Sequence, residues 1–258
     1  MRQNTQICKN YLSMSMNAAV DLGNTFAKIG WFAQNKLVEV QQKIPFENLQ
    51  TLLTQNPPAN VIFSSTSHDT QPFAQILAQL GTRIFELTPQ LPVPVKKDYQ
   101  TPQTLGPDRL AAVVGATTLF PNQNCLVIDM GTCITYDWIN AEAVFGGGII
   151  SPGLRMRFQA MHSFTKKLPL VEPQGFPPLV GKNTEQALQS GAINGLLAEM
   201  EGIMARYRAD FGACRVLLCG GDAPFFENRL KKRTFVAPNL VLIGLNRILQ
   251  YNVSSQKM

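Results

Sequence analysis

The stretch that decides the fold is CLVIDMGTCITYDWINAEAVFGGGIISPG, residues 125–153. Two runs rich in β-branched and apolar residues, Cys125–Ile128 and Cys133–Ile139, predict strands. A tight turn is predicted between them, and its Gly131 lets backbone N–H groups close on a phosphate. Because a carboxylate cannot face a polyphosphate without a cation between them, Asp129 implies a bound metal ion.

A glycine-rich segment follows the next predicted strand. Gly146-Gly147-Gly148 and Ser151-Pro152-Gly153 lead into a helix that is predicted to begin at about Leu154. A turn without Cβ atoms can approach a ligand closely, and the N-terminus of a helix favours anions. On this stretch alone, the alternative is a hairpin with an ordinary Asp-x-Gly turn.

The same turn occurs a second time near the start of the chain. Asp21-Leu22-Gly23-Asn24-Thr25 follows one apolar run and precedes another, 108 residues before the first motif (129 − 21). This spacing is too long for a solenoid repeat and predicts two related halves that face each other across a cleft. Paired Asp-x-Gly-Thr turns resemble the two phosphate motifs of the actin, sugar kinase and heat-shock ATPase superfamily.

Length and composition define the broad class. A chain of 258 residues predicts about two domains, which we place at residues 16–121 and 122–258 after a polar tail at residues 1–15. The net charge of +6 fits an anionic ligand, but the basic residues are scattered and no helix-turn-helix signal is present, so we expect no nucleic-acid partner. No apolar run reaches the ~20 residues of a membrane span. Five cysteines without a Cys-x-x-Cys pair argue against structural zinc and suit the cytoplasm.

The order of predicted elements indicates an α/β fold. Strands are predicted at residues 16–22, 26–34, 36–44, 60–65 and 83–87, with helices at 46–55 and from 69 or 70 to 80. This order suits a mixed sheet of ribonuclease H type. The second half repeats the strand-turn-strand plan, followed by helices at 154–167 and 184–211, strands at 215–218 and 234–236, and a closing helix at 242–251. We therefore predict two ribonuclease H-like domains with a nucleotide cleft between them.

Two further segments have more than one interpretation. A Pro-rich loop from Thr88 to Leu105 ends in Gly106-Pro107-Asp108-Arg109, where Asp108 is either a functional carboxylate or simply a good helix start. The predicted helix 184–211 contains Gly191, Gly195 and Gly202, which we expect to interrupt or kink it. Its small residues would let another helix approach, either in a dimer or within the chain.

Taken together and in this order, the motifs resemble type III pantothenate kinase. They are Asp21-Leu22-Gly23-Asn24-Thr25, Gly106-Pro107-Asp108-Arg109, Asp129-Met130-Gly131-Thr132 and Gly147-Gly148-Ile149-Ile150-Ser151-Pro152-Gly153. The likeness runs from about Met16 to the end of the chain. The Gly-x-Asp-Arg segment matters most, because the wider superfamily does not share it at this position.

The resemblance implies transfer of the γ-phosphoryl group of ATP to pantothenate, the first step towards coenzyme A. ATP would be held by Thr132 and by the first turn, namely Asp21, Leu22, Gly23, Asn24, Thr25, Phe26, Ala27 and Lys28. Asp21 would bind Mg²⁺ and Asp129 the monovalent cation, K⁺ or ammonium. Asp108 would be the general base, and pantothenate would contact Tyr99, Gly106, Pro107, Asp108, Arg109 and, from the neighbouring subunit of a homodimer, Thr184.

Two alternatives remain open at the level of the sequence. Some relatives of this family are described as accessory factors for transcription, and the positive charge is compatible with that role. A small ATP-dependent kinase for another hydroxylated acid would need the same phosphate turns. Stimulation of ATP turnover by pantothenate would separate all three functions.

Overall fold

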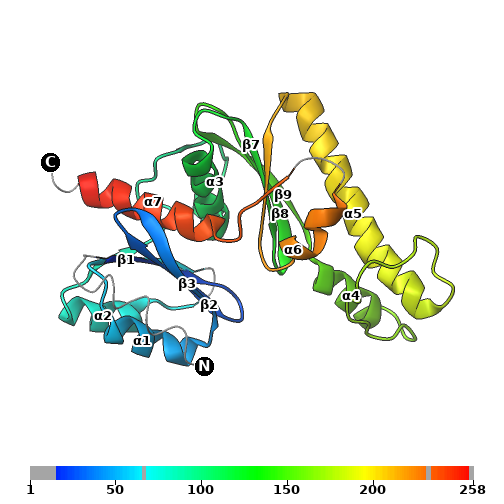
Figure 1. Ribbon diagram of the computed structural model, residues 1–258, viewed down its shortest axis with the longest axis horizontal. Coiled ribbons are helices and arrows are strands. Elements are labelled where there is room, and N and C mark those ends of the chain that lie inside the picture. Colours follow the sequence, from blue (N-terminus) through cyan, green and yellow to red (C-terminus); the bar gives the residue numbers. More distant parts are fainter. Residues whose placement is uncertain (1–15, 66–67, 231–233, 256–258) are drawn as a thin grey trace. The chain divides into compact units, whose positions relative to one another are not determined.

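The computed structural model describes residues 16–65, 68–230 and 234–255 (Figure 1). The chain divides into two compact units, Met1–Pro121 with Asn239–Met258, and Asn122–Pro238. The predicted tail at residues 1–15 lies outside the described residues. None of the helices in the described part of the chain is long and apolar enough to cross a membrane.

Unit 1 is built on a five-stranded mixed sheet with the order β3-β2-β1-β4-β5. The first three strands, β1 to β3, form an antiparallel meander, whereas β4 and β5 run parallel to β1. The strands are β1 (Met16–Leu22), β2 (Ala27–Ala33), β3 (Lys36–Ile44), β4 (Asn60–Ser65) and β5 (Arg83–Glu86).

Helices cover both faces of this sheet (Figure 1). On one face, α1 (Phe46–Gln55) and α2 (Gln71–Gln79) bury Leu49, Leu53 and Leu77 against the strands. On the other, α7 (Leu240–Ser255) packs on β1 and β4 and against α3 (Pro107–Leu119). The connection into α3 contains β6 (Lys96–Lys97) and the 3₁₀ helix η2 (Pro102–Thr104).

The closing helix corrects the predicted domain boundaries. We expected residues 122–258 to form one domain, but α7 belongs to unit 1 because its backbone packs directly on α3. A Cβ atom at Gly244 would overlap the carbonyl oxygen of Ala111, and one at Gly115 would overlap that of Leu240. Two helices approach this closely only where glycine leaves room, so α3 and α7 form one packed layer.

Unit 2 repeats the strand plan of unit 1. Its strands have the order β11-β10-β7-β8-β9, again an antiparallel meander with two further strands parallel to the first. They are β7 (Cys125–Met130), β8 (Cys133–Ile139), β9 (Val144–Pro152), β10 (Arg215–Cys219) and β11 (Phe235–Val236). The repeat confirms the prediction of two related α/β halves.

One face of the second sheet is covered by α4 (Leu154–Ser163) and α5 (Thr184–Phe211), with the short helices α6 (Ala223–Phe226) and η3 (Glu227–Arg229) nearby. The core contains alternate residues of β7 and β8, such as Ile128 and Tyr136, together with Ile193 and Met200 of α5. The expected interruption of α5 is wrong, because it is one helix of 28 residues. Its glycines lie on the exposed face, while its buried face keeps helical spacing.

Candidate functional site

The first predicted phosphate turn joins β1 to β2 in unit 1. Asp21 and Lys28 are direct cross-strand partners at its base, and both are half-buried. Because such partners lie on the same face of a sheet, their opposite charges lie side by side. The turn itself is open, with Asn24 and Thr25 exposed and Phe26 46% exposed. Unit 1 therefore presents an accessible turn with a carboxylate and an amine beneath it.

Sequence reasoning missed Ser64, which is the register neighbour of Asp21 on β4. Ser64 is buried, and its hydroxyl oxygen has no hydrogen-bond partner among the described residues. A buried polar atom without a partner is unusual, and one next to Asp21 fits a site that is completed by a ligand or water. A buried strand that ends in serine was the only signal in the sequence.

The second element of unit 1 is the start of α3. Gly106 is its N-cap and Pro107 its first residue, where the fixed φ of proline suits a helix. Oδ1 of Asp108 accepts a hydrogen bond of 2.8 Å from the N–H of Arg109. This contact agrees with the interpretation of Asp108 as a good helix start. It also fixes the position of the carboxylate, and Asp108 is half-buried. The Arg109 side chain is buried, and Tyr99 is half-buried in the loop before α3.

The second predicted phosphate turn joins β7 to β8 in unit 2. Gly131 and Thr132 are exposed, and the N–H of Gly131 donates to the carbonyl of Cys133 across 3.0 Å. Asp129 is half-buried at the base of the turn, opposite Thr135 on β8. The position of the carboxylate below an open turn thus repeats the arrangement at Asp21 in unit 1.

Two glycines from distant segments close on this second turn. Gly153, the N-cap of α4, donates its N–H to the carbonyl of Thr132 across 3.1 Å, and a Cβ atom there would overlap the carbonyls of Gly131 and Thr132. Gly220, after β10, has a φ of +88° and would place a Cβ atom 2.5 Å from Oδ1 of Asp129. The β7–β8 turn, the start of α4 and the turn after β10 therefore converge.

Asp222 extends this cluster at the start of α6. Its N–H donates to the carbonyl of Met130 across 3.0 Å, which ties the turn after β10 to the end of β7. Burial raises the pKa of the Asp222 carboxyl, and the positive charge of Arg155 on α4 acts in the opposite direction. In the structure, Gly220 packs against Asp129.

The last predicted residue, Thr184, is the exposed first residue of α5 in unit 2. Asn183 is the cap, because its side-chain oxygen accepts from the N–H of Gln186 across 2.8 Å. The predicted residues are thus divided between the two units. Asp21–Lys28, Tyr99 and Gly106–Arg109 lie on unit 1, whereas Asp129, Thr132 and Thr184 lie on unit 2.

The chemistry of these groups fits a magnesium nucleotide. Each turn is open to solvent, and each has one carboxylate at its base. Mg²⁺ is usually bound through one or two carboxylates together with substrate phosphates, so a full cage of protein ligands is not required. Among residues 16–65, 68–230 and 234–255, no three His, Cys, Asp or Glu side chains are grouped to hold a metal.

Comparison with solved structures places the fold. The chain resembles a protein assigned to the Baf family of transcriptional activators from Campylobacter jejuni, with a TM-score of 0.61, 20% identity, and coverage of 92% of this chain and 99% of that one. It also resembles a ROK hexokinase from Thermus thermophilus, with a TM-score of 0.53, 13% identity, and coverage of 93% and 99%. At these identities the likeness establishes the two-domain actin and sugar kinase fold alone.

Comparison of sequences establishes the family. A type III pantothenate kinase from Cytophaga hutchinsonii is 44% identical over 238 residues, which cover 92% of this chain and 100% of the relative. Another from Phocaeicola vulgatus is 44% identical over 239 residues, which cover 92% and 99%. The sequence profile of the family matches residues 18–206. The chain therefore belongs to the type III pantothenate kinase family.

Proposed function

We propose a mechanism for this chain, which is a kinase of the pantothenate kinase family. It phosphorylates pantothenate with ATP to give 4′-phosphopantothenate, which is the first step of coenzyme A biosynthesis. The observation that carries the proposal is the carboxylate of Asp108, which is held at the start of α3 by the N–H of Arg109. Asp108 accepts the proton of the pantothenate hydroxyl as that oxygen attacks the γ-phosphorus. The bond from this phosphorus to the bridging oxygen of ADP then breaks.

The two open turns bind the nucleotide in this proposal. Asp21–Lys28 and Thr132 contact ATP, Asp21 would hold Mg²⁺, and Asp129 would hold K⁺ or ammonium. Backbone N–H groups and Lys28 position the phosphates, whose charge these cations would neutralise. Phosphoryl transfer depends chiefly on such positioning and electrostatic stabilisation, so a base and two phosphate turns are sufficient parts.

The pantothenate site is proposed to need two copies of the chain. Tyr99, Gly106, Pro107 and Arg109 contact the substrate in one subunit, and Thr184 of a neighbouring copy completes the site in a homodimer. Exposure of Thr184 at the first turn of α5 supports this role. We also propose that the enzyme is cytoplasmic, which the four free cysteines of the described chain support.

The two other functions have less support. The structural likeness to a protein assigned to the Baf transcriptional activators carries the fold alone at 20% identity. A kinase for another hydroxy acid would use the same turns, but the relatives at 44% identity are pantothenate kinases. A transcriptional accessory factor, in contrast to either kinase, has no use for a fixed carboxylate at Asp108 between two phosphate turns in the sequence.

ADP release with and without pantothenate, in Mg²⁺ and K⁺, tests the proposal. Asp108→Asn should fold normally and bind ATP, while its pantothenate-dependent turnover falls about 10²- to 10⁴-fold, the usual contribution of a general base. Asp69→Asn is a matched control, because Asp69 also accepts a backbone N–H, that of Gln71, at a helix start. The control should keep wild-type turnover. Wild-type turnover in Asp108→Asn would remove the base assignment, and no response of the wild type to pantothenate would overturn the proposed reaction.

A further inference from the structure

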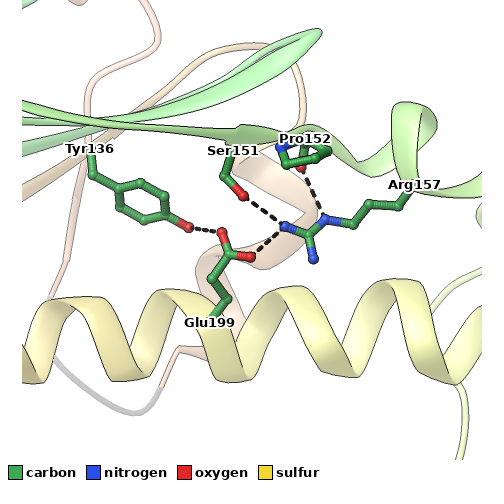
Figure 2. Close-up of polar contacts among 5 residues, drawn as sticks. All are labelled: Tyr136, Ser151, Pro152, Arg157 and Glu199. Atoms are coloured by element: carbon green, nitrogen blue, oxygen red, sulfur yellow. Dashed lines mark hydrogen bonds and ion pairs between the residues drawn. The ribbon is translucent and has the colours of Figure 1, made fainter. Parts of the chain in front are cut away.

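A polar cluster in unit 2 joins four elements (Figure 2). On α4, Arg157 donates from Nε to the carbonyl of Pro152 across 3.0 Å. Its Nη2 donates to Oγ of Ser151 across 3.1 Å and to Oε2 of Glu199 across 2.5 Å. The other oxygen of Glu199, on α5, accepts from the hydroxyl of Tyr136 on β8 across 2.8 Å. Arg157 thus connects α4 to the end of β9 and to α5, and Glu199 extends this link to β8.

The charges of this cluster are fixed near neutral pH. Burial opposes ionisation of Glu199, but hydrogen bonds from Arg157, Tyr136 and Ser151 outweigh it and hold the pKa of its carboxyl below the usual value. Burial, followed by the hydrogen bond to Glu199, raises the pKa of Tyr136 far above its ordinary value. Glu199 therefore stays ionised and Tyr136 stays protonated near neutral pH, and we call the group of Tyr136, Ser151, Arg157 and Glu199 the clamp. Charge-assisted bonds of this kind are stronger than neutral ones.

The clamp acts next to the phosphate turn. Arg157 binds the last two residues of β9, Ser151 and Pro152, and the next residue is Gly153. Gly153 donates to the carbonyl of Thr132 and has no space for a Cβ atom. A shift of the Ser151–Gly153 segment must therefore move the Gly131–Thr132 turn or break its contact. A short path of hydrogen bonds and the Ser151–Gly153 backbone leads from the guanidinium group to the turn.

We propose that Arg157 and Glu199 are positioning residues that hold the Gly131–Thr132 turn in its nucleotide-binding conformation. The inference rests on the proposed contact between Thr132 and ATP. Arg157 binds three acceptors with a planar fork, which lysine cannot reproduce with a single ammonium group. Without the fork, the Ser151–Gly153 segment loses its tie to α5, and the turn loses its fixed support. The loss should appear in nucleotide binding more than in pantothenate binding.

The test measures the Kd of Mg-ATP by calorimetry without pantothenate, together with both KM values. Arg157→Met, Arg157→Lys and Glu199→Gln should each raise the Kd and the KM of ATP about tenfold, since small misplacements of a binding group carry large penalties. The KM of pantothenate should stay within about twofold of the wild-type value, because these variants leave the proposed contacts with that substrate unchanged. In the double variant Arg157→Met/Glu199→Gln, the effects should be far from additive, because the two residues share one interaction.

Two control variants separate positioning from stability. Gln159→Ala changes an exposed residue of α4 whose side chain donates to Ser163, and should leave both Kd and melting temperature unchanged. Met204→Ala removes most of a fully buried side chain on α5, and should lower the melting temperature without weakening the binding of Mg-ATP. If Arg157→Met does not fold, Arg157→Lys and Glu199→Gln decide the result.

The outcomes distinguish the inference from the proposed function. A Kd of wild-type size in the Arg157 and Glu199 variants, with a melting temperature lowered as in Met204→Ala, overturns the positioning role. If the wild type binds Mg-ATP but does not respond to pantothenate, the proposed reaction fails, and the binding shift alone decides the positioning role. A wild type that does not bind Mg-ATP overturns both.

Discussion

Gly106 lies directly against Asp108: a Cβ atom at Gly106 would be 2.6 Å from Oδ1 of the carboxylate. The backbone of Gly106 has φ −55° and ψ 130°, which any L-residue before proline can adopt. Glycine is therefore needed here to leave space for the carboxylate, and not for its backbone conformation. The glycine keeps open the space in which Asp108 accepts the N–H of Arg109.

Gly106→Ala should consequently separate catalysis from stability. The new methyl group displaces the Asp108 carboxylate, which can rotate away at little energetic penalty, so the melting temperature should change by no more than about two degrees. Pantothenate-dependent turnover should fall at least about tenfold, because a displaced base no longer meets the substrate hydroxyl. Gly221→Ala, at a glycine with nothing within 4 Å of a new Cβ atom, is the control. Full activity of Gly106→Ala would contradict the assigned role of Asp108.

Gly220 and Gly221 form a matched pair for the second turn. Ala at Gly220 must adopt a φ of +88° and would meet Oδ1 of Asp129 and the backbone of Met130, whereas Ala at Gly221 meets nothing within 4 Å. Left-handed conformation alone destabilises a non-glycine residue by roughly 1–2 kcal/mol. We expect Gly220→Ala to lower the melting temperature by several degrees and to weaken ATP binding. Gly221→Ala should change neither the melting temperature nor ATP binding. Thermal melts and ATP titrations of both variants check this, and equal behaviour of the pair would contradict it.

The fold could be predicted from the sequence because its signals are local. Apolar runs and Asp-x-Gly turns identified both antiparallel meanders, and the recurrence of the turn identified the repeated strand order. The two Asp-x-Gly turns and the start of α3 were predicted in the same way. Each is a short segment whose residue types report the local backbone conformation.

Long-range packing could not be predicted. The contacts of Gly115 with Leu240 and of Gly244 with Ala111, which bring α7 into unit 1, join segments more than one hundred residues apart and leave no periodic signal. The glycines of α5 suggested a break, but burial of its other face stabilises a continuous helix. The clamp was also missed, because Arg157 and Glu199 lie 42 residues apart and each resembles an ordinary helix surface residue.

Stability should depend on pH through Glu199. The folded pKa of this carboxyl lies below its value of 4.5 in the unfolded chain, so its stabilising effect is fully present above about pH 4.5. The effect is lost as pH falls through the folded pKa. The melting temperature of Glu199→Gln should lie a few degrees below that of the wild type at pH 7, since a charged hydrogen bond contributes ~1.5–3 kcal/mol. The difference should shrink towards pH 3, and a constant difference would contradict this account.

The cation requirement should depend on Asp129. We expect activity to rise with added K⁺ or ammonium and to stay low in Na⁺ alone, because we propose that the carboxylate below the Gly131–Thr132 turn binds the monovalent cation. Asp129→Ala should weaken this response. Initial rates across a titration of each salt at constant ionic strength provide the measurement. Equal wild-type rates in Na⁺ and K⁺ would remove the cation role from this residue.

Assembly should depend on the exposed face of α5. Cβ atoms at Gly191, Gly195 and Gly202 would meet nothing within 4 Å in the described chain, which argues against packing of these glycines within one subunit. If this face meets a second copy in the homodimer, Gly195→Leu should shift sedimentation towards the monomer. Turnover with pantothenate should then fall, because Thr184 of the partner subunit is lost, while ATP binding persists. Gln75→Leu on the exposed side of α2 is the control for added apolar surface and should stay dimeric and active. A fully active monomer, in the wild type or in Gly195→Leu, would show that Thr184 does not act across a dimer interface.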